Sequence, residues 1–165
     1  MLHRGSIIIV SLLIVFSGSF AFAQKNAAPS GQFGIGIYGL NSWLPEPPGG
    51  MTFTYALSHT MQLGSYFGLD VASGDIGNLT EFTLKPFFRY IIDAAVSPFF
   101  QGGMNIISAG TTGVGLFFGG GLAYYLNQTF GIHAEMDVMQ IGFSPSGIIF
   151  GFSNVKAGVE WYMGK

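Results

Sequence analysis

A long central stretch, Ala94–Ala134, contains no Asp, Glu, Lys or Arg, and it limits what this 165-residue chain can fold into. Within it, Ile106–Leu126 is long and apolar enough to be considered as a transmembrane helix. Glycine, however, occupies six of the twelve positions from 110 to 121, and each glycine costs a helix about 1 kcal/mol relative to alanine. The stretch therefore has the polarity of a membrane segment but not the composition of a helix.

A period of two fits the same residues better than a helical period. From Val114 to Leu126, large apolar side chains alternate with small ones. Alternate residues share one face of a β-strand, so this pattern predicts a strand. The alternation recurs in six further segments, near residues 33–38, 52–57, 62–71, 81–90, 130–138 and 154–163.

The two faces of these strands differ in kind. One face is large and apolar, whereas the other carries Gly, Thr, Asn, Gln and nearly every charge. Charged residues make up 8% of the chain, against about 25% in an ordinary soluble domain, so the polar face cannot coat a soluble protein. A wall that is apolar outside and polar or small inside is typical of a transmembrane barrel, which also leaves no unpaired backbone in lipid. We predict an all-β, eight-stranded, antiparallel up-and-down transmembrane β-barrel.

The composition also excludes several classes of protein. The chain has no Cys, which excludes a disulfide scaffold and a Cys-ligated metal site. Its six Lys and Arg residues cannot build a phosphate-neutralising face, so no nucleic-acid partner is expected. We predict no catalytic, cofactor-binding or metal-binding residues.

The eight predicted strands leave connections of two kinds. Short turns at 59–60, 93–97 and 127–129 are expected to face the periplasm, and longer connections at 41–50, 73–77 and 108–112 to face outward. Aromatic residues near strand ends are candidates for interfacial girdles: Trp43, Tyr90, Tyr124, Tyr125, Trp161 and Tyr162. The predicted strands run over residues 32–41, 51–58, 61–72, 79–92, 98–108, 113–126, 130–143 and 148–163.

The first 23 residues have the layout of a cleaved secretory signal peptide. His3 and Arg4 precede the apolar run Ile7–Phe16, and Ala21 and Ala23 place small residues before a cleavage site. The run is short for an uncleaved anchor that must cross about 30 Å of hydrocarbon. We therefore predict a signal peptide over 1–23 and one barrel domain over 24–165.

Three segments resemble a known family. They read PFFQGG from Pro98, FGGGLAYYL from Phe118 and FGIHAE from Phe130, and they are similar to the small outer-membrane β-barrel domain of Gram-negative bacteria. The resemblance covers essentially the whole mature chain. It implies location in the cell outer membrane, contact with outer-membrane lipid, and insertion by periplasmic chaperones and the barrel-assembly machinery. We expect a monomer without a cofactor, and the surface partner stays unidentified.

The inward face gathers most of the charges. An eight-stranded barrel is only wide enough for its own side chains to fill it, and unpaired buried charges are costly. We therefore expect Arg89, Lys85 and Lys156 to plug the lumen by pairing with carboxylates, namely Glu135, Asp137 and Glu160. The predicted lumenal polar network comprises Glu81, Lys85, Arg89, His133, Glu135, Asp137, Lys156 and Glu160, with Asp70 nearby in the pattern.

A structural or surface-interaction role follows most directly from a plugged barrel. Three alternatives stay open: a narrow channel for ions or small solutes, an enzyme that modifies lipid A, and a secreted, soluble ligand-binding barrel. For the enzyme, His133 and Glu135 form the only His–carboxylate pair at strand spacing.

Overall fold

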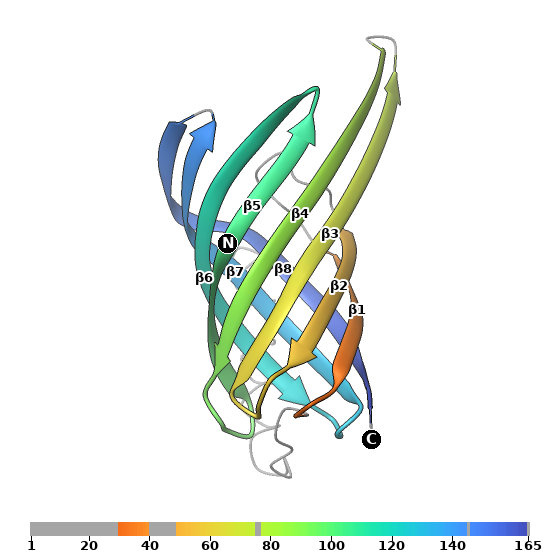
Figure 1. Cartoon of the computed structure of the whole chain (residues 1–165), viewed down its shortest axis with the longest axis vertical. Helices are drawn as coiled ribbons and strands as arrows, with labels where there is room; N and C mark the ends of the chain where they lie inside the picture. The colour runs from red at the N-terminus through yellow and green to blue at the C-terminus, as the bar shows by residue number, and fades with distance from the viewer. Residues whose placement is uncertain (1–29, 40–48, 75–76, 145, 165) are drawn as a thin grey trace, which may run out of the picture.

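The computed structural model describes residues 30–39, 49–74, 77–144 and 146–164. Its strands form a closed barrel in which each strand pairs antiparallel with its sequence neighbour and β8 pairs with β1 (Figure 1). The predicted all-β, eight-stranded, antiparallel barrel is confirmed. The strands are β1 (Phe33–Gly39), β2 (Gly49–Ala56), β3 (Met61–Gly74), β4 (Gly77–Ile91), β5 (Ser97–Ala109), β6 (Thr111–Tyr125), β7 (Phe130–Ser144) and β8 (Ser146–Met163).

In the described ranges, no helix is long and apolar enough to cross a membrane. The glycine-rich stretch that was considered as a helix contains the end of β5 and all of β6, joined at Gly110. Gly110 has a φ of +78°, a conformation that glycine adopts without steric cost. The alternation of side chains, rather than mean hydropathy, therefore predicted this part of the chain correctly.

Two connections are much shorter than the sequence predicted. β3 and β4 continue through the segment expected to be a loop at 73–77, and only residues 75–76 separate them. β5 and β6 likewise take up most of the segment at 108–112. The ladder pairs continue to Gly74↔Gly77 and Ala109↔Thr111, so backbone pairing replaces most of the expected loops. The predicted connection at 41–50 lies mostly outside the described residues.

The extra length makes β3 and β4 a two-stranded ribbon that reaches past the other strands at the upper end in Figure 1. The β2–β3 ladder ends at Gly68 and the β4–β5 ladder begins at Phe82, whereas β3 and β4 stay paired as far as Gly74 and Gly77. The opposite end of the barrel carries the short turns at 57–60, 92–96 and 126–129. In the last of these, Asn127 Oδ1 accepts the N–H groups of Thr129 and Phe130 at 2.7 and 2.8 Å.

Large apolar side chains cover the outer wall. Phe33 is 65% exposed and Trp161 is 61% exposed, whereas the next residues along the chain, Gly34 and Tyr162, are buried in the lumen. The same alternation holds along the other strands, and it confirms the inverted arrangement that the sequence predicted. The outward set includes Ile37, Phe53, Leu63, Leu69, Phe88, Phe100, Phe118, Leu122, Ile132 and Val138.

The prediction of interfacial girdle residues is wrong at two positions. Tyr125 and Tyr162 point into the lumen and are almost fully buried. Their chain neighbours Tyr124 and Trp161 take the outward phase, because adjacent residues of a strand face opposite sides of the sheet. Tyr90 faces outward as predicted, and Trp43 lies outside the described residues.

Candidate functional site

The inward faces of β4, β7 and β8 carry the candidate site. All eight residues of the predicted lumenal polar network are buried, with at most 8% of any of them exposed. Glu81, Lys85 and Arg89 share one face of β4 because their spacing is even. Asp70 is exposed, although it lies opposite Glu81 in the β3–β4 ladder.

Arg89 is the centre of the ionic contacts. Its Nη2 donates to Glu135 Oε2 at 3.2 Å, and its Nη1 lies 3.5 Å from Glu160 Oε1. The three side chains come from β4, β7 and β8, so the contacts cross the lumen between strands that are not all neighbours. A guanidinium presents several donors in a fixed planar fork, which suits it to bridge two carboxylates.

Neutral groups complete the surroundings of Arg89. Its Nη2 also donates to the hydroxyl of Tyr66 at 2.7 Å, and this hydroxyl donates to Glu135 Oε2 at 2.5 Å. Gln62 and Gln101 accept from Arg89 Nη1 and Nε, each at 3.3 Å. All three nitrogen atoms of the buried guanidinium therefore donate hydrogen bonds, as the stability of a buried charge requires.

Aromatic rings enclose the same guanidinium. Its Cζ lies 4.4 Å from the ring centre of Phe99 and 4.9 Å from that of Phe87, both within cation–π range. Phe87, Arg89 and Ile91 are successive inward residues of β4, and they divide the lumen into levels. One apolar cluster contains Ile91, Phe99, Ala123, Tyr125 and Tyr162, and the other contains Tyr38, Tyr66, Phe87 and Phe117. Arg89 therefore lies between two apolar layers.

Lys85 forms a second ionic level. Its Nζ donates to Asp137 Oδ2 at 2.7 Å and lies 4.5 Å from the ring centre of Phe117. Gln140 donates to the same carboxylate oxygen at 3.1 Å. The sequence predicted that Lys85 would pair with a carboxylate, and the structure identifies Asp137 as its partner.

Lys156 contacts aromatic rings that the sequence pattern did not predict as its partners. It lies directly opposite Glu135 in the β7–β8 ladder, and its Nζ is 4.8 Å from the ring centre of Tyr66 and 5.7 Å from that of Tyr38. The sequence pattern predicted only carboxylate partners for Lys156. The strand phase of Tyr38 and Tyr66, which places both rings inside, was the signal that could have identified these cation–π partners.

His133 lies deep inside the barrel. Its imidazole ring packs against Gly158, which lies opposite it on β8. A Cβ atom at position 158 would lie only 2.7 Å from Cε1 and 2.8 Å from Nε2 of His133, so the absence of a side chain there leaves room for the ring. Nδ1 is 4.0 Å from Glu160 Oε1. Among the described residues, no group of three or more His, Asp or Glu side chains could hold a metal ion.

The fold is similar to that of a solved bacterial β-barrel domain. The N-terminal β-barrel domain of Pseudomonas aeruginosa OprF matches with 18% identity and a TM-score of 0.59, over 81% of this chain and 98% of that domain. Ail, the attachment invasion locus protein of Yersinia pestis, matches with 15% identity and a TM-score of 0.40, over 81% of this chain and 95% of Ail. No family model and no curated protein matches the sequence. The OprF match shows the fold: this chain shares the architecture of that β-barrel domain.

Proposed function

We propose that the protein is an integral outer-membrane β-barrel whose lumen is plugged by polar and charged side chains, with a structural or surface-interaction role. The observation that carries the proposal is the buried contact of Arg89 with Glu135 and Glu160 inside a wall of outward apolar side chains. A barrel with charged side chains inside and apolar side chains on its outer wall is stable only if its surroundings are apolar, as in the core of a membrane.

The lumen supports the plugged half of this proposal. An ion that crosses the barrel would have to pass the Arg89 level and both apolar clusters around it. Opening this level separates Arg89 from two buried carboxylates and leaves buried charges without their partners, which is energetically costly. Side chains of this size fill an eight-stranded barrel.

Recording from purified, folded protein in planar bilayers tests the plug. We expect no steady, large conductance. A steady open level would favour the channel alternative and contradict the plug. Heat-modifiable gel mobility in detergent, together with fractionation of the outer membrane, separates an integral barrel from a soluble secreted one.

The orientation of the barrel has an independent test. The chain has no Cys, so single cysteines can be introduced without background labelling. A cysteine at Gly110, in the β5–β6 turn, is expected to react with a membrane-impermeant reagent on intact cells. A cysteine at Asn127, in the opposite turn, is expected to react only after the outer membrane is permeabilised; the reverse pattern would contradict the proposed orientation.

The ribbon of β3 and β4 supports a role at the cell surface, because it extends past the end of the barrel opposite the short turns. A strain that lacks the protein distinguishes the two roles. Leakage of the outer membrane indicates a structural role, whereas loss of attachment with an intact barrier indicates surface interaction. If the ribbon carries the surface role, a variant with a shortened ribbon should lose attachment and keep an intact outer-membrane barrier.

A further inference from the structure

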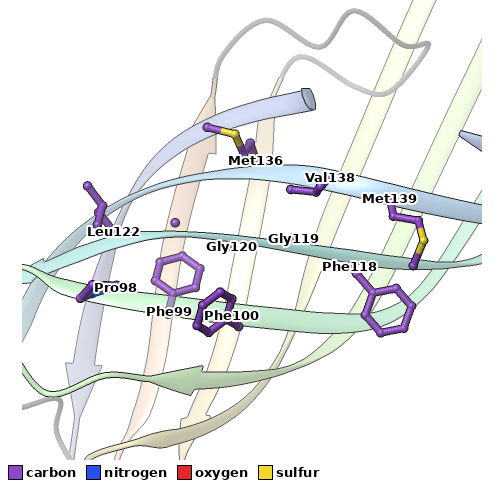
Figure 2. Close-up of a pocket in the computed structure, with 11 residues that line it drawn as sticks. Pro98, Phe99, Phe100, Phe118, Gly119, Gly120, Leu122, Met136, Val138 and Met139 are labelled. Atoms are coloured by element: carbon purple, nitrogen blue, oxygen red, sulfur yellow. The ribbon is translucent and has the colours of Figure 1, made fainter. Parts of the chain in front are cut away.

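The outer wall of the barrel carries a groove of about 640 Å³ that follows β6. Figure 2 shows side chains of three neighbouring strands around its floor at Gly119 and Gly120. Phe100 on β5 and Met136 on β7 form its sides.

A missing side chain and a β-bulge create this groove. Gly120 takes the outward phase of β6, and it lies directly opposite Phe100 on β5 and Met136 on β7. A hollow therefore replaces the large side chain that the alternation would place there. On β7, the register with β6 shifts at Val138, so that Val138 and Met139 both line the groove. A bulge of this kind redirects side chains locally.

The side chains that line the groove favour contact with hydrocarbon chains. Every side chain that borders the groove is aliphatic, aromatic or a thioether, and none offers a charge or a hydrogen-bonding group. The groove is continuous with the outward apolar wall, because Phe118 and Leu122 at its two ends are each more than 40% exposed. A wall of this polarity around a charged lumen faces the hydrocarbon of a bilayer.

The groove lies in the half of the wall that is nearer the short turns. Pro98, at its edge, is the second residue of β5 after the turn at 92–96, and Leu122 lies just before the end of β6 at Tyr125. In the proposed orientation this half faces the periplasmic leaflet, which glycerophospholipids occupy. A concave surface contacts more atoms of a chain than a flat wall does, and flexible Met side chains adapt to its shape.

We propose that this groove binds one acyl chain of a glycerophospholipid from the periplasmic leaflet and retains it as a specific lipid. The inference rests on the proposed function, because it needs a barrel that is inserted in the membrane in the stated orientation.

Methionine methyl groups provide the readout. Met136 and Met139 line the groove, whereas Met51 and Met104 lie on the outer wall away from it and are 42% and 43% exposed. With ¹³C-methyl methionine, all four methyl groups are expected to show contacts with acyl protons in a protonated lipid bilayer. After transfer to deuterated detergent, contacts with acyl protons should persist at Met136 and Met139 and disappear at Met51 and Met104.

A matched pair of variants links the signal to the groove. Leu122→Trp places a larger side chain at the end of the groove and should abolish both the retained contacts and the glycerophospholipid found by mass spectrometry of the purified protein. Leu63→Trp makes the same change on β3, outside the groove, and should retain both. Heat-modifiable mobility verifies that each variant is folded.

Several outcomes would overturn the inference. Equal loss of contacts at all four methyl groups in wild-type protein would show that the groove retains no lipid. Contacts between differently labelled copies at Met136 would identify a subunit interface, and retained lipid A would assign the other leaflet. If Met51 and Met104 lack acyl contacts even in the bilayer, the proposed membrane insertion itself is wrong.

Discussion

Replacement of Arg89 by methionine is expected to destabilise the folded barrel by about 3–5 kcal/mol, the usual cost of removing one partner from a buried ion pair. Methionine keeps much of the side-chain volume between the rings of Phe87 and Phe99. It removes the charge that contacts Glu135 at 3.2 Å and Glu160 at 3.5 Å. The expected loss therefore comes from two carboxylates that stay buried without this cation.

Two further variants separate the charge from the geometry. Arg89→Lys keeps the charge but loses the planar fork, so its stability should lie between those of wild type and Arg89→Met. The triple variant R89M/E135Q/E160Q removes both carboxylates as well, and it should recover at least half of the loss. This recovery is expected because uncharged replacement of a buried cation together with its carboxylate partners is often nearly neutral. It stays partial because Lys156, which is buried opposite Glu135, keeps its charge.

Equilibrium unfolding in urea, with the barrel folded in lipid vesicles, measures these differences. Tryptophan fluorescence, to which Trp161 on the outer wall contributes, follows the transition, and the heat-modified gel band reports the folded fraction. A loss below about 1 kcal/mol in Arg89→Met would mean that the contacts behave like a surface pair. A triple variant no more stable than Arg89→Met would show that the buried carboxylates are not the cause of the loss.

The remaining predictions concern single positions, each measured by the same unfolding assay. Gly158→Val should cost about 1–3 kcal/mol because it overpacks the lumen against the His133 ring and the carbonyl oxygen of Ile37. Adding His133→Ala should recover only the part of that loss that comes from the ring, and no recovery would contradict the contribution of the ring. Gly110→Ala should cost about 1–2 kcal/mol because φ is +78° there, whereas Gly110→Asn should cost less; equal costs would argue against backbone strain. Asn127→Ala should cost about 1 kcal/mol through the hydrogen bonds that its Oδ1 accepts from backbone N–H groups, whereas Asn127→Asp keeps the acceptor and should be nearly neutral.

The sequence was sufficient to predict the barrel because the main signal is local. Phe88 and Arg89 face opposite sides of β4 solely because they are adjacent in a strand. The strand phase, combined with few charges, was enough to predict which side chains face the lumen. It also located the turns at 57–60 and 126–129 to within a few residues.

The sequence predicted the structure less well where one residue type is found in two different environments. An aromatic residue near a strand end predicts an interfacial girdle, yet Tyr162 points inward and donates its hydroxyl hydrogen to Glu160. Strand length was also underestimated at β3 and β4. Ser and Gly in the segment at 73–77 indicated a loop, whereas cross-strand pairing extends the ribbon through most of it.

The sequence by itself determined the strand order, the alternation and the division between an apolar wall and a charged lumen, because all three depend on neighbours along the chain. Only the tertiary structure decided which charges meet. Arg89 on β4 reaches Glu160 on β8 across the barrel, and Lys156, whose ladder neighbour is Glu135, places its Nζ 4.8 Å from the ring centre of Tyr66 on β3. The level of each residue in the lumen depends on the tilt and stagger with which the sheet closes, and these are properties of the whole barrel.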